Sequence, residues 1–215
     1  MRAVFAILLL LCPAGARAQG APPAAARADV LDDIKTQLTP FSALRGSFRQ
    51  VKTIRILKRP LRSSGEFLLA KDQGALWRTL KPSVSTVKVT SSEVAQIKDG
   101  KVGFRMGVED QPALRMVTKV LFAVFAADVD ELKRHFDITG ESKAGRWQAE
   151  LKPKEPLVAK VIPLIRMRGS KVLDAIQISE ANGDLTAIDF AGVELDAKLR
   201  ADESALFGVE SHAAN

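Results

Sequence analysis

Short segments of alternating character, separated by turn residues, fill the chain from Gly46 to Val108. Asp72-Gln73-Gly74 and Asp99-Gly100 are typical of the turns that join two antiparallel strands. Six strands are predicted there, at residues 46–57, 65–71, 75–80, 83–91, 93–98 and 101–108. No connection between them is long enough for a crossover helix, so the strands should form an antiparallel meander.

A second series of strands is expected closer to the C-terminus. Its members are predicted at residues 137–141, 145–151, 164–168, 172–180 and 184–190. Asn182-Gly183 is the strongest turn signal in the sequence and suits a type I′ turn. Residues 193–199 are a candidate for one more strand. The total is about ten to eleven antiparallel strands.

Helices are predicted before and between the two series. Asp29 can cap a first helix, in which Leu31, Ile34 and Leu38 form one apolar stripe, and Pro40 ends it. Further helices are expected at residues 112–126, at 129–136 after the capping pair Asp128 and Glu131, and at 156–161.

The helix expected at residues 112–126 is too apolar to face water. A single sheet of ten or more twisted strands tends to curl, and a barrel of that size is too wide for its own side chains to fill. The helix therefore lies against the apolar face, either as a core helix or as a plug. The predicted fold class is therefore mainly β (α+β): a curled antiparallel sheet of about ten to eleven strands with this helix against its apolar face.

The first eighteen residues have the three parts of a secretory signal peptide. Arg2 gives the positive start, residues 4–12 the short apolar core, and Ala16-Arg17-Ala18 the cleavage signal. Cys12 does not fit a lipidation site, because Leu11 precedes it and Pro13 follows it. Cleavage near Ala18 predicts an exported, periplasmic protein without cysteine. No later apolar run reaches the roughly 18 residues of a membrane span, so this mature protein should be soluble. The expected organisation is a flexible arm at 19–28, a single domain at 29–210 and a tail at 211–215.

Patterns of catalysis and metal binding are missing from the sequence. It contains no nucleophile elbow, phosphate-binding glycine loop or zinc-protease motif. One Cys and two His exclude a zinc ribbon or an iron–sulfur cluster. His135 and His212 are isolated in polar segments and are interpreted as surface residues. The sequence thus predicts neither an enzyme nor a cofactor or metal.

Basic residues exceed acidic ones, 32 against 25, and cluster at residues 52–62 and 152–171. Nucleic-acid binding would require aromatic residues interleaved with them, but Trp77 and Trp147 lie in apolar strands. The clusters are either a solvated rim or a contact with an anionic membrane surface or acidic partner.

The order of these elements resembles a known family. The resemblance is carried by G-S-F-x-Q at Gly46–Gln50, a glycine-led strand at Gly65–Leu69, Leu76–Trp77, W-x-x-x-L-x-P at Trp147–Pro153 and G-D-x-T-x-I-x-F at Gly183–Phe190. From about residue 29 to 210, the chain is similar to LolA and its LolA-like relatives, the periplasmic carriers of outer-membrane lipoproteins. The resemblance implies an unclosed barrel whose concave apolar face holds acyl chains beneath a helical lid.

The resemblance also implies roles for individual side chains. The expected cavity walls are Phe48, Phe67, Leu69, Trp77, Phe104, Met106 and Trp147. The expected lid side chains are Leu114, Val117, Leu121, Phe122 and Phe125. The implied partners are acylated cargo, an inner-membrane donor, an outer-membrane acceptor and, transiently, the membrane surface. Nucleic acid is not among them, and a monomer is expected.

Two positions depart from the family pattern. Well-known members carry an Arg-Pro pair where this chain has Lys71 and Asp72, and the Arg holds the lid shut. Lys71 is the expected lid latch here, with a point charge in place of a planar fork. The family's C-terminal motif is reduced to Leu206-Phe207-Gly208-Val209.

Three functions stay open from the sequence. The first is a carrier of lipoproteins or related acylated cargo. A LolA-like paralogue that moves a glycolipid, sterol or polyene conjugate for a dedicated exporter is its variant. The second is a lipid-sensing regulator with the same half-barrel, like the amino-terminal domain of RseB. The third is an enzyme with its active site in the cavity.

Overall fold

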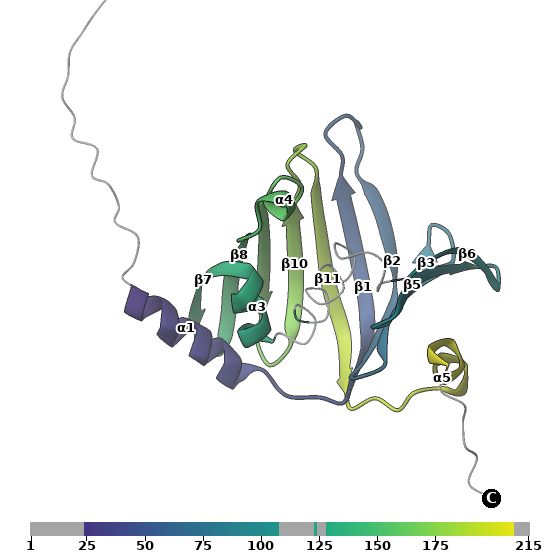
Figure 1. Ribbon diagram of the computed structural model, residues 1–215, viewed down its shortest axis with the longest axis horizontal. Coiled ribbons are helices and arrows are strands. Elements are labelled where there is room, and N and C mark those ends of the chain that lie inside the picture. The colour runs from purple at the N-terminus through teal and green to yellow at the C-terminus, as the bar shows by residue number, and fades with distance from the viewer. Residues whose placement is uncertain (1–23, 108–122, 124–127, 209–215) are drawn as a thin grey trace, which may run out of the picture.

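A computed structural model describes residues 24–107, 123 and 128–208 of the chain. Eleven antiparallel strands form one sheet, in the order β6-β5-β4-β3-β2-β1-β11-β10-β9-β8-β7. The first six strands step outward on one side of β1, and the last five step back to meet it on the other. β6 and β7 are the two edges, so the sheet is open and not closed into a barrel (Figure 1). The predicted meander and the open antiparallel fold are confirmed.

The strands are β1 (Ala43–Thr53), β2 (Leu61–Ala70), β3 (Gly74–Lys81), β4 (Ser85–Val89), β5 (Glu93–Lys98), β6 (Lys101–Gly107), β7 (Phe136–Lys143), β8 (Arg146–Pro153), β9 (Leu164–Gly169), β10 (Leu173–Ser179) and β11 (Leu185–Leu195). The helices are α1 (Ala24–Gln37), α3 (Val129–His135), α4 (Pro156–Ala159) and α5 (Ala201–Phe207). Within the described ranges, no helix has the length and hydropathy needed to cross a bilayer.

The two faces of the sheet carry different side chains. The inner face presents Phe67, Leu151 and Met167, and α1 and α3 cover part of it (Figure 1). The outer face presents the alternate residues of each strand, such as Leu68 and Arg166. Because successive side chains in a strand point to opposite sides, register decides which of them are buried together.

Helix α5 packs on the outer face of the sheet. Leu206 and Phe207 pack there against a cluster of Ala43, Leu68, Ala70 and Leu76. The Glu203 carboxylate, nearly buried, accepts hydrogen bonds from Arg45 of β1 (2.5 Å) and from the Arg200 backbone N–H (2.7 Å). This helix was not predicted from the sequence, and residues 193–199 were a candidate for one more strand instead. That strand is wrong, because β11 continues unbroken to Leu195.

Two predicted boundaries are also wrong. α1 begins at Ala24, so Asp29 lies inside the helix and does not cap it, and residues 24–28 are helical where a flexible arm was expected. β1 ends at Thr53, four residues before the predicted end at Leu57. By contrast, the capping prediction for α3 is confirmed, because Asp128 Oδ1 accepts a hydrogen bond from the Glu131 backbone N–H at 3.0 Å.

Candidate functional site

The inner face carries two apolar clusters that meet at Phe190 of β11. In the first, strands β7–β10 pack beneath α1 and α3, and we call this part the helix-covered half. Its buried residues include Leu31 and Ile34 of α1 together with Leu151 and Met167 of the sheet. The second cluster lies over β1–β4 and β11, and we call it the aromatic half.

Four aromatic rings form the centre of the aromatic half. Phe48 and Trp77 are stacked with their ring centroids 3.8 Å apart, and Phe190 meets Phe67 edge-on at 5.2 Å. Phe67 and Phe190 also approach Trp77, each at 6.3 Å. The four rings come from β1, β2, β3 and β11, which pair side by side at the middle of the sheet. Together they form a broad apolar surface at the middle of the sheet.

Glycines make room for these rings. A Cβ atom at Gly46 of β1 would lie 2.8 Å from Cε1 of Phe67, so only glycine lets that ring lie across the strand. Gly65 of β2 sits opposite Phe48, and a Cβ there would lie 1.9 Å from the carbonyl oxygen of Arg78. Both glycines belong to the segments that carry the family resemblance, and their physical role is space.

The predicted wall residues lie on one face of the sheet, but in different surroundings. Phe48, Phe67, Leu69 and Trp147 are buried, with 2–4% of each side chain exposed. Trp77 is half-buried. Phe104 of edge strand β6 is 46% exposed, and Met106 beside it is half-buried. The structure brings together Phe48, Phe67, Leu69 and Trp77, and separates them from Trp147.

Trp147 lies in the helix-covered half, not among the other rings. Its indole N–H donates to the carbonyl oxygen of Ser170 at 2.8 Å, and the ring lies over Gly169. The void beside it, bounded by α1 and α3, holds only about 20 Å³. A wall role for Trp147 therefore stays a prediction, while its packing already accounts for its burial.

Phe190 is the aromatic residue that the sequence analysis did not assign to the site. Its motif was recognised at Gly183–Phe190, but periodicity alone does not say which strand it joins. The pairing of Phe48 with Phe190 across β1 and β11 brings together residues 142 positions apart. A signal for this contact would have required the register of those two strands.

The five predicted lid side chains, Leu114, Val117, Leu121, Phe122 and Phe125, lie outside the described residues. The expected latch, Lys71, lies in the β2–β3 turn with its side chain exposed, and its backbone N–H donates to Ser42 at 2.9 Å. It borders a pocket of about 560 Å³ between this turn and the end of α1. Leu69 and Phe41 line the same pocket and join it to the aromatic half.

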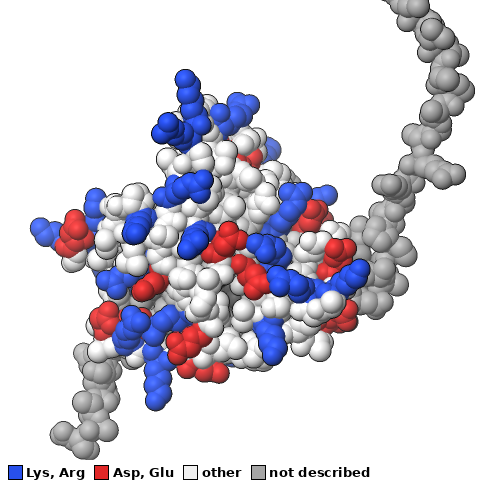
Figure 2. Space-filling view, turned by 180° about the vertical axis from the view of Figure 1, so that it is seen from behind, with Lys and Arg blue, Asp and Glu red and all other residues white. Residues whose placement is uncertain are grey.

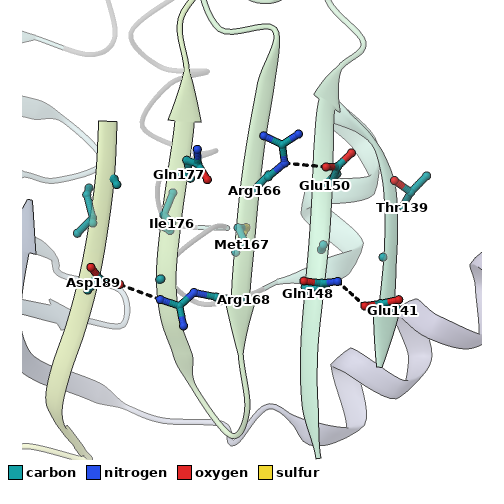
Figure 3. Close-up of a pocket in the computed structure, with 15 residues that line it drawn as sticks. Thr139, Glu141, Gln148, Glu150, Arg166, Met167, Arg168, Ile176, Gln177 and Asp189 are labelled. Carbon is teal, nitrogen blue, oxygen red and sulfur yellow. Dashed lines mark hydrogen bonds and ion pairs between the residues drawn. The ribbon is translucent and has the colours of Figure 1, made fainter. Parts of the chain in front are cut away.

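A second pocket, of about 510 Å³, lies over strands β7–β11 and carries charged side chains (Figure 3). Glu150 pairs with Arg166 at 2.7 Å, and Asp189 pairs with Arg168 at 2.8 Å. Gln148 donates to the carboxylate of Glu141. The Glu150–Arg166 and Gln148–Glu141 contacts join neighbouring strands, and the Arg168–Asp189 pair reaches across β10. These groups satisfy one another, so the pocket is a polar sheet face with a cross-strand ladder and not a set of reactive groups.

Titratable groups that could support catalysis or metal binding are scattered over the described part of the chain. No group of three or more His, Cys, Asp and Glu side chains is placed there to hold a metal ion. His135, expected at the surface, is partly buried between Glu131 and Glu155, whose oxygens lie 3.4 Å and 3.1 Å from the ring nitrogens. The hydrogen bond to His135 lowers the pKa of Glu155. This contact joins the end of α3 to the start of α4.

Similar solved structures include a LolA superfamily protein of Nitrosomonas europaea (9% identity, TM-score 0.45, covering 82% of this chain and 96% of that one). A DUF1329 family protein of Desulfovibrio piger has 13% identity and a TM-score of 0.48, with 86% of this chain and 97% of that one covered. MucB has 13% identity and a TM-score of 0.46, with 88% of this chain and 64% of that one covered. No curated protein matches the sequence at a significant level. Residues 21–212 match the family model of the outer membrane lipoprotein carrier protein LolA-like proteins, and the chain therefore belongs to this family.

Proposed function

We propose that the protein is a periplasmic carrier, which shields the acyl chains of lipoproteins or related lipidated cargo during transfer from the inner to the outer membrane. The observation that carries the proposal is the aromatic half: four rings and their aliphatic neighbours on one face of an open sheet, in a LolA-like chain. Family members are described as carriers and not as enzymes. The proposed carrier is a single domain over residues 29–210.

The energetics of lipid transfer explain why such a surface is needed. Burying one methylene group stabilises the buried state by about 0.8 kcal/mol, so a chain of about 16 carbons gains on the order of 12 kcal/mol from leaving water. Spontaneous passage through an aqueous compartment is negligible at that cost. A protein that replaces the bilayer with its own apolar face removes the barrier.

Release of the lipid requires that the apolar face of the empty carrier is also covered from water. The lid expected at residues 112–126, with Leu114, Val117, Leu121, Phe122 and Phe125, belongs to this proposal, as does Lys71 as its latch. A lid that covers the face in the empty state offsets part of the binding energy and keeps loading reversible. The acceptor must then offer a stronger site than the carrier does.

The most specific part of the proposal is the chemical class of the cargo. This chain has Lys71 and Asp72 in place of the family's Arg-Pro pair. Two kinds of cargo are therefore compared: an acylated lipopeptide and a non-protein lipid. Both would be handed on by an inner-membrane donor and received by an outer-membrane acceptor. Mass spectrometry of the lipid that co-purifies with the exported protein identifies which of the two it carries.

The positions of the two tryptophans provide a direct test. Trp77 lies in the aromatic half, whereas Trp147 lies under α1 and α3. The Trp147→Phe variant keeps only Trp77, and the Trp77→Phe variant keeps only Trp147. We expect a diacylated lipopeptide with brominated acyl chains to quench most of the fluorescence of the first variant and little of the second, because bromine quenches tryptophan only at close range.

The same titration with brominated phosphatidylglycerol distinguishes lipoprotein cargo from a general lipid. An unbrominated lipopeptide serves as the control for changes in conformation. Absence of quenching in both variants, with either lipid, contradicts the carrier function. Equal quenching of both tryptophans contradicts the assignment of the aromatic half as the binding surface.

A further inference from the structure

Exposed apolar side chains gather on the β1–β2 loop and on α4 with the turn after it. Among the described residues, nine large apolar side chains are exposed, and five of them belong to these segments. They are Ile56 (84% exposed), Leu57 (45%), Leu61 (53%), Leu157 (77%) and Val161 (62%). The first three belong to the β1–β2 loop and its end, and the other two to α4 and the turn after it. We call residues 52–62, 154–161 and 180–184 the rim.

The three segments of the rim are held together as one surface. The Arg55 backbone N–H donates to Asp184 Oδ1 at 2.9 Å, and this joins the β1–β2 loop to the β10–β11 turn. The Ala181 backbone N–H donates to the carbonyl oxygen of Val161 at 2.9 Å, which joins the same turn to α4. Figure 1 shows the β1–β2 loop, the β10–β11 turn and α4 together at the upper end of the sheet.

The rim is strongly basic. It contains seven Lys or Arg and three Asp or Glu, a net charge of +4. The carboxylates are engaged, since Asp184 is buried, Glu180 pairs with Lys52 at 2.8 Å and Glu155 contacts His135. The exposed cations Arg55, Lys58, Arg59, Arg62 and Lys160 form no ion pair with another described residue. Seen from behind in Figure 2, Lys and Arg crowd the protruding upper tip of the molecule.

We propose that the rim docks the protein on the surface of an anionic bilayer, an inference that rests on the carrier function and places the contact in the fold. Apolar side chains on a basic surface are the combination that enters the lipid interface, with the cations at the lipid phosphates. Lys and Arg can bury their aliphatic stems there and keep their charges at the headgroups. Ile56 and Leu157, on separate elements, provide two apolar points of insertion.

An acidic protein partner fits the rim less well. Protein interfaces are depleted of Lys and bury their apolar residues in one packed core, with the charges at its edge. Here the exposed apolar residues project from separate loops, and Lys or Arg residues lie between them in the chain. A fluid lipid surface can accept such a distribution, because it does not need a complementary shape.

The rim also continues into the inner face of the sheet. Ile162, next to Val161, and Ile178, two residues before Glu180, pack against the cluster of the helix-covered half. Strands β1, β10 and β11 then run from the rim into that face, and β1 and β11 carry Phe48 and Phe190. A protein seated on its rim therefore presents the start of its apolar face to the bilayer from which it takes cargo or to which it delivers it.

Vesicle binding tests the proposal with the purified mature protein. We expect it to co-sediment with vesicles of phosphatidylethanolamine and phosphatidylglycerol, and to bind vesicles of pure phosphatidylcholine at least tenfold more weakly. High salt should weaken binding to the anionic vesicles, because cations on the protein supply part of the attraction. If the wild-type protein does not co-sediment with anionic vesicles, the proposal is overturned, and a protein partner is left as the occupant of the rim.

Matched variants locate the contact. Lys58→Gln with Arg59→Gln should lower the partition coefficient about fivefold for each cation removed, and Ile56→Ser should lower it about tenfold. The control for the cations is Lys171→Gln with Lys198→Gln, two exposed residues at the opposite end of the strands, and the control for Ile56 is Val102→Ser on edge strand β6. Equal losses in rim and control variants overturn the proposal.

Two further measurements separate this proposal from the carrier function. In the mature protein, from which signal cleavage removes Cys12, an environment-sensitive dye on the Ile56→Cys variant should shift to the blue with anionic vesicles, and the same dye on Val102→Cys should not. In the Trp147→Phe background, the rim variants should still load brominated lipopeptide delivered from detergent, with Trp77 quenched as it is without the rim substitutions. If the protein with an unchanged rim fails to load lipopeptide but still binds anionic vesicles, the carrier function alone is contradicted. If the dye at position 56 stays in water, the docking is contradicted.

Discussion

At the scale of single residues, the sheet depends on glycines whose importance lies in the space they leave. Gly65 in β2 has an ordinary backbone conformation, so its role is not conformational freedom. The Arg78 carbonyl of the neighbouring strand approaches it so closely that a Cβ would lie 1.9 Å from the oxygen. Gly65 also lies opposite Phe48, and the close approach helps Phe48 to reach Trp77 across the strand between them.

The Gly65→Ala variant should therefore be strongly destabilised. We expect the free energy of unfolding to fall by about 3 kcal/mol, because the added methyl group forces two backbones apart. The control is Gly103→Ala in edge strand β6, where the nearest atom would lie 4.0 Å from the new Cβ, and its effect should stay within about 0.5 kcal/mol. Urea unfolding measures both. Similar stabilities for the two variants would contradict the close approach.

The candidate site was only partly predictable from individual residues. Phe48, Phe67, Leu69 and Trp77 lie together on one face, as apolar residues of alternating strands can, and their role as cavity walls stays a prediction. Trp147 was expected with them, but it packs under α1 and α3. Periodicity gives the face of a strand and not its place along the sheet, and that place decided both the separation of Trp147 and the omission of Phe190.

At the scale of elements, β4, β5 and β6 illustrate how a sheet edge is stabilised with few buried residues. The carboxylate of Glu93 in β5 forms ion pairs with Lys88 of β4 at 2.5 Å and with Arg105 of β6 at 3.0 Å. The hydrogen bond from Lys88 is the main cause that lowers the pKa of Glu93 from its ordinary value of 4.5, and the charge of Arg105 adds to it. One carboxylate thus links three strands.

This linkage predicts a pH-dependent stability. A carboxyl whose pKa is lower in the folded protein stabilises it fully above its ordinary pKa, and this contribution is lost as the pH falls through the lowered folded value. We expect Glu93→Gln to cost about 1 kcal/mol at pH 7 and less at pH 3, because proton uptake by the wild-type carboxyl as the pH falls removes the same charge that the substitution removes. Urea unfolding at the two pH values tests it.

Glu150→Gln is the matched control, since it removes a cross-strand pair with Arg166 that is exposed at both ends. Its cost at pH 7 should be the smaller one, because water screens an exposed pair. A pH-independent difference between wild type and Glu93→Gln would show that Glu93 acts through packing and not through its charge.

Most elements were predictable, and the exceptions have physical causes. β5 matches its predicted bounds, because Asp99 and Gly100 both take the positive φ angles of a type I′ turn after it. The turn at Asn182-Gly183 is different: only Gly183 has a positive φ, and Glu180 and Asp184 close a three-residue loop through the Glu180 N–H. The type I′ prediction there is wrong, since a type I turn followed by glycine gives the same dipeptide signal.

Helices α1 and α5 were mispredicted at the element scale for two different reasons. The start of α1 is rich in Ala with no capping residue, so the first Asp was taken as its beginning. α5 is short, and it is fixed by tertiary contacts: the Arg45–Glu203 pair and the packing of Leu206 on the outer face. Local pattern does not contain those partners, because they lie more than 100 residues away.

At the scale of the whole molecule, the inner face divides into halves with different consequences for function. The helix-covered half is packed by α1 and α3 down to a void of about 20 Å³, which is too small for an acyl chain. The aromatic half borders the pocket of about 560 Å³ beside Lys71 and contains the half-buried Trp77. One half should hold the sheet together, and the other should hold the lipid.

This division predicts opposite effects for two large-to-small substitutions. Leu151→Ala removes a side chain that is 1% exposed, and should lower the free energy of unfolding by about 2–5 kcal/mol while lipid affinity stays within about twofold. Trp77→Ala should lower lipid affinity at least tenfold, because it removes the largest ring of the aromatic half. Calorimetric titration with lipopeptide, at a temperature where both variants are folded, measures the affinities. An affinity loss in Leu151→Ala as large as in Trp77→Ala would mean that the lipid site extends across the whole inner face, and the two halves would then be a single surface.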